Sequence, residues 1–374
     1  MTVAERQEPF VAAYERLKTS APAGPAWLRD AREAAMRQFA DSGFPTTRHE
    51  DWRFTNISPI VQTEFAPTGP TPTAGQVAAH LFADSLAHVA VIASGRFAPG
   101  LSSLDGLPKD VFAGSLAAAL ASNPDWLQPA LAQLAVGDHP FVWLNTALFE
   151  DGVLIRVPDN VIVERPIQVH VASDAASDPT VSHPRVLVIA GENSQVSIIE
   201  SYGGPEGQCY FTNAVTEVLV APGAVVHHVK VQRESRKAFH IAGTFARLGR
   251  GSVFSSHNIS FGGGIVRNDI SAVLDGEGGE ATLNGLYLAD GDRLVDNHTV
   301  IDHAKAHCPS HEVYKGVLGG KARAVFNGKI FVRQDAQKTN AKQTNKALLL
   351  SDDAQINTKP QLEIFADDVK CTHG

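Results

Sequence analysis

The chain has 374 residues, of which 44% are hydrophobic and 19% charged, a composition typical of a globular protein and too apolar for a disordered one. Its formal charge of −8 gives no electrostatic support for binding nucleic acid or an anionic membrane. Three widely spaced cysteines, Cys209, Cys308 and Cys371, argue against a disulfide framework. The start of the sequence lacks the pattern of a secretory signal, so we expect a cytoplasmic protein without a membrane span.

Residues 1–65 are predicted to form an N-terminal helical region. Between Pro25 and Ala40, apolar residues recur at helical spacing and charged residues fill the other positions, while Gly43 and Pro45 mark the end. Residues 66–150 are predicted to be a linker followed by a mixed α/β segment. The linker is rich in proline and threonine from Ala66 to Gly75, and beyond it HVAVIA predicts a strand and residues 115–135 a helix.

From residue 151 to residue 374 helix signals nearly vanish and short alternating apolar runs take over, each broken by Gly, Asn or Asp. A rough repeat of turn phrases appears when six residues are taken as equivalent: Ser194, Ala224, Ser252, Glu280, Ala322 and Ala354. The intervals are 30, 28, 28, 42 and 32 residues, and those near 30 fit one coil of a solenoid better than the blade of a propeller or the hairpins of a sandwich. We therefore expect a mainly β protein whose core, residues 151–374, is a right-handed parallel β-helix.

The densest group of potential metal ligands lies in DNHTVIDHAKAHCPSHE, which contains His303, His307, Cys308 and His311. The spacing is not that of a structural zinc site. Strand alternation places His298 and His303 on opposite faces, as it does His227 and His228. The favoured interpretation is a set of solvent-facing and turn histidines that form hydrogen bonds across coils, and a surface metal-binding cluster is the alternative.

A second pair of potential ligands ends the chain in ADDVKCTHG. In a strand, positions i and i+2 face the same side, so Cys371 and His373 are predicted to lie within reach of one metal ion. Two ligands do not complete a site. Either the others come from elsewhere, or the pair is a strand end with a packed cysteine and a solvated histidine.

Motifs of hydrolases, nucleotide-binding loops and zinc proteases are missing: GxSxG, GxxxxGK[ST] and HExxH do not occur. We therefore expect no nucleotide to bind to this chain and no catalytic residue in it.

Four blocks carry a resemblance to a known family: RHEDWRFTNIS (48–58), VDNHTVIDHAKAHCPSHEVYKGVL (295–318), FNGKIFVRQDAQKTNAKQTNKALLLS (326–351) and PQLEIFADDVKCTHG (360–374). They closely resemble the SufB/SufD family of iron–sulfur cluster assembly proteins, and the EDWRFT block and the plain KCTHG ending favour its SufD branch. The resemblance covers essentially the whole chain.

The resemblance implies a non-catalytic scaffold subunit that pairs with SufB along the β-helix and works with the ATPase SufC. Iron or a nascent cluster would be held transiently between the two subunits, with His373 as a ligand and Cys371 as a less certain neighbour. The family continues past Gly374 into helices that dock SufC, so this part of the sequence lacks the predicted SufC contact, and a homodimer is a further possibility in isolation.

Two other functions stay open. A SufB-like subunit would itself accept sulfur, which would make Cys308 or Cys371 a reactive thiol. A β-helix enzyme acting on polysaccharides would need a groove with paired carboxylates, and no such pair stands out.

Overall fold

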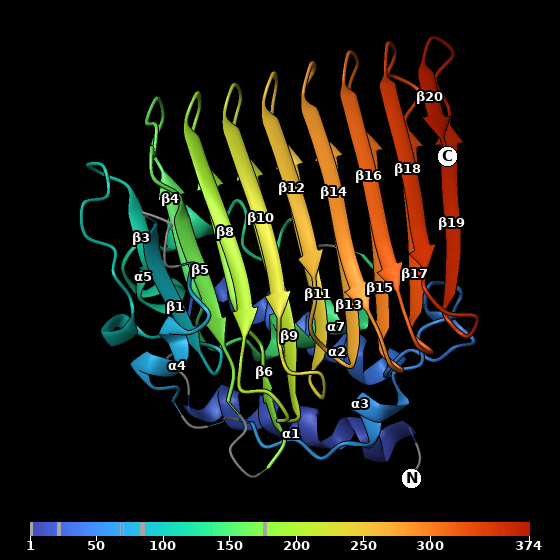
Figure 1. Ribbon diagram of the computed structural model, residues 1–374. Coiled ribbons are helices and arrows are strands. Elements are labelled where there is room, and N and C mark those ends of the chain that lie inside the picture. The colour runs from blue at the N-terminus through green and yellow to red at the C-terminus, as the bar shows by residue number, and fades with distance from the viewer. Residues whose placement is uncertain are drawn as a thin grey trace.

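The computed structural model describes residues 3–20, 24–67, 69, 71–82, 87–135, 137–174 and 178–374. Two long sheets face each other and are wound from one chain into a solenoid of about eight turns (Figure 1). Helices from the N-terminal part lie beside this solenoid. The prediction of a mainly β protein with a β-solenoid core is confirmed.

We call the sheet nearer the viewer in Figure 1 the front sheet and the other the rear sheet. The front sheet has the strand order β2 (Arg96–Phe97), β1 (His88–Ala93), β5 (Ile167–Ala172), β8 (Gln195–Gly203), β10 (Val225–Arg233), β12 (Val253–Ser260), β14 (Glu280–Ala289), β16 (Pro309–Leu318), β18 (Asn340–Leu349), β20 (Lys370–His373). The rear sheet has the order β19 (Gln355–Ile364), β17 (Arg323–Val332), β15 (Leu294–His303), β13 (Ile265–Leu274), β11 (Phe239–Leu248), β9 (Tyr210–Val220), β7 (Arg185–Ala190), β4 (Val153–Val157), β3 (Phe112–Ser115), and β6 (Thr180–Ser182) pairs with β9.

From β4 onward, successive coils pair in parallel, and paired residues stand 26 to 33 positions apart, from Phe239 with Ile265 to Val153 with Val186. Alternate side chains of both sheets point into the space between them, where small and branched apolar residues form the main core. Cys308 belongs to this core, because it follows a turn at the same place in its coil as Ser194, Ala224 and Ser252. The solenoid is therefore held together by burial of the inward faces of its two sheets.

Two glycines of the front sheet make room for tyrosine rings. A Cβ added to Gly285 would overlap the ring of Tyr314, and one added to Gly316 would overlap the ring of Tyr287. Both rings are fully buried, at 0% and 1% exposure. Each glycine therefore lets an aromatic ring lie flat across the neighbouring strand.

We expect Gly316→Ala to lower the free energy of unfolding by about 1–3 kcal/mol, because the added methyl group must displace the Tyr287 ring or the strand. Gly319→Ala is the matched control, since its new Cβ would meet only Asp290 at 4.0 Å. Urea-induced unfolding followed by circular dichroism measures both. Equal midpoints for the two variants would contradict the steric explanation.

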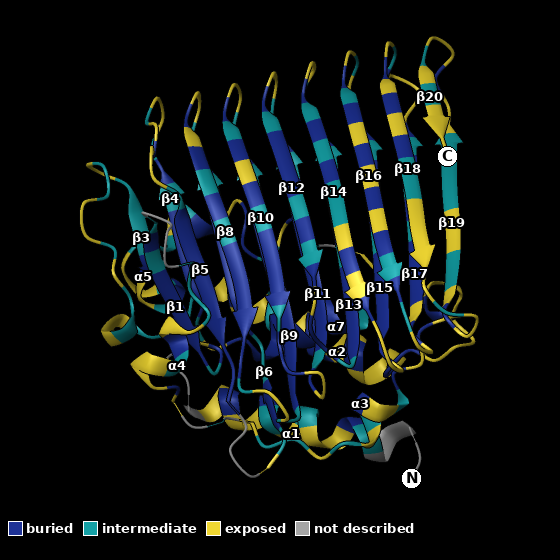
Figure 2. Ribbon diagram, viewed as in Figure 1, coloured by how far each residue is buried: buried dark blue, intermediate teal, exposed yellow. Residues whose placement is uncertain are grey.

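The helices of the N-terminal part are α1 (Val3–Ser20), α2 (Ala26–Ser42), η1 (Glu50–Trp52), α3 (Ser58–Gln62), α4 (Ala74–Ala78), η2 (Pro99–Leu101), α5 (Leu116–Ser122), α6 (Pro124–Leu127) and α7 (Pro140–Leu148). Apolar residues of α1, α2 and α7 pack together with outward residues of the rear sheet, among them Phe211, Ile241 and Ile265. Burial follows this layering: β9 and β11, which pack against α7, are almost entirely buried, whereas β14, β16 and β18 of the front sheet carry exposed positions, drawn yellow in Figure 2. Among the helices that the structure describes, none has an apolar stretch long enough to cross a membrane.

Local predictions in this part were of mixed accuracy. The helix expected from Pro25 to Ala40 is α2, and HVAVIA is β1. The helix expected over residues 115–135 is instead two short helices, α5 and α6, and α7 was not predicted. Within the expected linker, positions 68 and 70 lie outside the described residues, and the rest leads into α4.

Two features of the predicted solenoid need correction. Strand pairing begins before residue 151, because β1 pairs with β5 and β3 pairs with β4. The proposed repeat also mixed two sets of turns. Ser194, Ala224 and Ser252 lead into the front sheet, whereas Ala322 and Ala354 lead into the rear sheet. The period of about 30 residues is real, but in both sets a small buried residue follows the turn, so the two kinds of turn look alike in sequence.

Candidate functional site

The last strand, β20, lies at the C-terminal edge of the front sheet and pairs with β18 alone. Cys371 pairs with Ala341 and His373 with Gln343, so both side chains are on the inward side of the sheet; the alternation predicted that they share a face, though not which one. Gly374 extends this pairing, since its amide donates to Gln343 O at 2.9 Å and its carbonyl accepts from Asn345 N at 2.9 Å. The two potential ligands therefore share one face of an edge strand.

The two side chains differ in exposure. Cys371 is half-buried and packs with Ala341, Ala366 and Val369, and this burial raises the pKa of its thiol above the usual 9.0. His373 is exposed at the open edge. Because a thiol must lose its proton to bind a metal, His373 is the more accessible ligand of the pair at neutral pH.

The four residues suggested as a surface cluster do not come together. His303 and Cys308 are buried in the solenoid interior, where His303 Nε2 lies 2.9 Å from Ser310 Oγ and Cys308 Sγ contacts Gly276 O. Burial lowers the pKa of His303 to about 4 and raises that of Cys308. His307 is exposed in a turn with φ of 61°, and His311 is exposed on the outer face of β16. The favoured interpretation was therefore wrong for His303, which faces the core, and the four side chains cannot share one ion.

No group of three or more His, Cys, Asp or Glu side chains with the geometry for a metal ion occurs among the residues that the structure describes. Cys371 and His373 are thus an incomplete pair within the described part of the chain. As predicted, His227 and His228 point to opposite faces, and so do His298 and His303.

Two of the sequence blocks singled out above meet on the outer face of the rear sheet. The guanidinium of Arg267 lies 2.9 Å from Asp296 and 2.8 Å from Asp269, donates to Asp51 O at 2.6 Å, and sits 3.7 Å from the ring centroid of Trp52. Burial would raise the pKa of Asp269, but Arg267 and a nearby histidine hold it well below its usual range. The arginine thus fastens η1 to β13 and β15.

Two histidines flank this arginine. His139 Nε2 lies 3.0 Å from Asp269 Oδ2, and His298 Nε2 lies 3.0 Å from Asp296 Oδ1. Thr55 Oγ1 donates to Asp296 Oδ2 at 2.6 Å. A polar groove of about 640 Å³ runs alongside. Because Asp269 and Asp296 are both paired with Arg267, this network anchors the N-terminal segment rather than forming a metal site.

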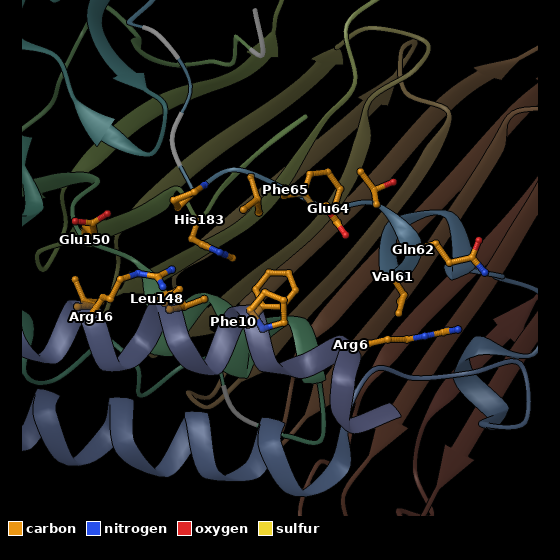
Figure 3. Close-up of a pocket in the computed structure, with 16 residues that line it drawn as sticks. Arg6, Phe10, Arg16, Val61, Gln62, Glu64, Phe65, Leu148, Glu150 and His183 are labelled. Carbon is orange, nitrogen blue, oxygen red and sulfur yellow. The ribbon is translucent and has the colours of Figure 1, made fainter. Parts of the chain in front are cut away.

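A second cavity, of about 560 Å³, lies between α1 and residues 61–67 (Figure 3). Its lining mixes aromatic and apolar residues with both charges, including Phe10, Phe65, Arg6, Glu64 and Glu150. Neither Cys371 nor His373 lines it. The cavity is a feature of the helical layer, separate from the edge strand.

A buried polar row adjoins His373 and was not recognised as part of the site from the sequence. Gln343 is 2% exposed and its Nε2 donates to Glu312 Oε2 at 2.8 Å, while Glu312 is 1% exposed. Burial raises the pKa of Glu312 to about 7, and the hydrogen bond from Gln343 offsets only part of this effect. The spacing in the sequence could have revealed this row, since Glu312, Gln343 and His373 follow one another at intervals of one coil length.

Comparison with known families decides what kind of protein this is. A model described as the SufBD core domain of the SUF system for FeS cluster assembly matches residues 170–374, and one described as the SufBD N-terminal region matches residues 6–169. The chain belongs to the SufBD family.

Individual relatives agree with this SufBD assignment. An iron–sulfur cluster assembly SufBD family protein of Synechocystis is 33% identical over 93% of this chain and 79% of its own length. The iron–sulfur cluster assembly protein SufD of Escherichia coli is 30% identical over 91% of this chain and 78% of its own. SufD of Bacillus subtilis is 25% identical over 94% of this chain and 82% of its own. The resemblance drawn from the sequence blocks is therefore confirmed, and the chain is a SufD-like member of an iron–sulfur cluster assembly family.

Proposed function

We propose that this SufD-like chain is a non-catalytic scaffold subunit that binds iron or a nascent iron–sulfur cluster at its C-terminal edge strand. The cargo would be shared with SufB as the partner subunit, in a complex that also contains the ATPase SufC. His373 is the main ligand in this proposal, and Cys371 is a second, less certain one.

The observation that carries the proposal is the incomplete pair on an unpaired edge. β20 presents an imidazole and a thiol on one face, and both are accepted ligands of iron in proteins. Among the described residues no third ligand completes the pair. An edge strand offers unpaired backbone groups to another chain, so a partner that adds to this edge would bring further ligands next to His373.

The chemistry required of this chain is modest. His373 must present a neutral ring nitrogen to iron, and Cys371, where it takes part, must release its proton to become a thiolate. A site shared between two subunits can gain or lose ligands when the subunits move, which suits a scaffold that must release its product. The remaining iron ligands would be supplied by the other subunit.

We expect His373→Ala to reduce cluster formation on the complex strongly while leaving the fold of the chain intact. The experiment is co-purification with SufB and SufC followed by anaerobic reconstitution, with iron and sulfide content and the visible absorption spectrum as readouts. Thr372→Val is the matched control, since Thr372 is the exposed neighbour that points to the other face. If His373→Ala forms as much cluster as the wild type, the proposed role of His373 as a ligand is wrong.

The SufB-like alternative, in which this chain itself accepts sulfur, has less support from the geometry. Reactive thiols are accessible and have a lowered pKa, whereas Cys308 is fully buried, Cys371 is half-buried, and burial raises the pKa of both. Labelling of Cys308 at the rate of a free thiol in the folded chain would reopen that alternative.

A further inference from the structure

Three polar side chains stand in one row across the last three strands of the front sheet. Glu312 on β16 pairs with Gln343 on β18, and Gln343 pairs with His373 on β20. Side chains paired in this way lie about 5 Å apart on the same face. The pairing of β18 with β20 continues through Gly374, so the backbone at His373, the last residue of the row, is fixed against β18.

The middle member of the row has an unused acceptor. The amide nitrogen of Gln343 donates to Glu312 Oε2 at 2.8 Å, but its carbonyl oxygen, Oε1, has no partner although the residue is only 2% exposed. A buried carbonyl left unpaired costs about 1–3 kcal/mol. An unpaired acceptor in this place therefore indicates a donor that reaches it from the open side of the row.

The amide has little freedom to turn elsewhere. A Cβ added to Gly328, on the facing strand β17, would overlap the amide of Gln343, so the amide packs directly against that backbone. Glu312 holds the nitrogen on one side. The ring of His373 stands in the next position of the row on the other side.

We infer that Gln343 is a positioning residue for His373: its Oε1 accepts one ring N–H of His373 and leaves the other ring nitrogen free to bind iron. Histidines that bind metals usually donate their second ring N–H to a carbonyl or carboxylate, which selects the tautomer and orients the ring. Glu312 accepts the hydrogen bond from the Gln343 amide nitrogen, so the amide oxygen is the end that faces His373. The role toward iron rests on the proposed function, whereas the hydrogen bond itself is a property of this chain alone.

Two variants test the hydrogen bond. Gln343→Met keeps the length of the side chain but removes the acceptor. The double variant Glu312→Gln with Gln343→Glu reverses the polarity of the pair, so that the new amide on β16 would donate to the new carboxylate on β18, whose second oxygen would accept from His373. Thr344→Val, on the outer face of the same strand, is the matched control.

The first measurement uses the metal-free chain. Long-range 1H–15N NMR correlations of the ring nitrogens, assigned with His373→Ala, report the tautomer of His373. We expect one dominant tautomer in the wild type and in Thr344→Val, a mixture in Gln343→Met, and recovery in the double variant. The wild-type tautomer pattern in a folded Gln343→Met chain would overturn the inference.

The second measurement is an anaerobic titration of the same chains with Co²⁺, a spectroscopic stand-in for Fe²⁺. Loss of a partner that orients a ligand typically lowers metal affinity about 10–100-fold, and we expect Gln343→Met to fall in that range. If wild type and His373→Ala bind Co²⁺ equally, the proposed ligand role of His373 fails, while the tautomer measurement still decides whether Gln343 holds the ring. If metal binding depends on His373 but not on Gln343, the positioning role fails and the proposed function stands.

Discussion

Replacing Glu217 with alanine is expected to lower the free energy of unfolding by about 3–5 kcal/mol, the range for breaking a buried ion pair from one side. Glu217 and Arg185 are both fully buried, on β9 and β7 of the rear sheet. The Glu217 carboxylate also accepts hydrogen bonds from the amides of Ala132, Leu134 and Ala135, at 2.9, 3.0 and 3.1 Å. The substitution therefore leaves a guanidinium and three amides without their acceptor in a dry environment.

Part of the guanidinium would remain satisfied, because Arg185 also donates to Asn145 Oδ1 at 2.9 Å and to Thr146 Oγ1 at 3.2 Å on α7. This network joins the helical layer to the rear sheet. We therefore expect the damage to start in the segment around residues 132–135.

Urea-induced unfolding measures the total loss for Glu217→Ala, and hydrogen exchange at Ala132, Leu134 and Ala135 measures the local part. Glu363→Ala is the matched control on the same sheet, where the ion pair with Lys329 is 41% exposed on the glutamate side and contributes at most about 1 kcal/mol. A loss below about 1 kcal/mol for Glu217→Ala would show that the buried pair contributes no more than the exposed one.

Replacing Glu312 with glutamine is expected to make the chain more stable, relative to wild type, as the pH rises. An unfolded glutamate loses its proton near pH 4.5, whereas folded Glu312 keeps its proton up to about pH 7 because it is buried. Between these values the unfolded wild type binds fewer protons than the folded one, so wild-type stability falls with rising pH and levels off above pH 7. Glutamine does not titrate, so the stability of the variant does not fall with pH for this reason.

The difference in stability between Glu312→Gln and wild type should therefore grow by about 2–3 kcal/mol from pH 5 to pH 8, at about 1.4 kcal/mol for each pH unit below the folded pKa. Denaturation at four or five pH values measures it, with the exposed Glu277→Gln variant as the control for loss of one carboxylate. Because Gln can still accept from the Gln343 amide, the variant keeps the row intact. A constant difference over this range would mean that folded Glu312 ionises like an ordinary glutamate.

Much of the solenoid could be predicted from local patterns. Alternation along runs such as QVSIIES, which became the start of β8, needs only the geometry of a strand with one buried face. The coil length of about 30 was visible in the turns, but the two sets of turns could not be separated, because in both a turn containing glycine or aspartate leads to a small residue. Helix α7 was missed because its residues from Phe141 to Leu148 are all buried, which removes the amphipathic period that reveals a helix.

The site was predicted only where a local rule applied. Cys371 and His373 lie on one face because they are two positions apart in a strand, and this required no tertiary information. The placement of His303 depended on which face of β15 meets the core. The sequence around it is polar on both faces, so alternation separated His298 from His303 but could not tell which one is buried.

By itself the sequence determined the strand-rich architecture, the coil length, the family and the shared face of the two C-terminal ligands, because these follow from alternation, turn chemistry and long distinctive blocks. Only the tertiary structure decided what stands next to those ligands. Stacking of coils brings Glu312 and Gln343 from 61 and 30 positions away into one row with His373. That row depends on the length of every intervening turn, and a change of one residue in a turn would place a different side chain beside His373.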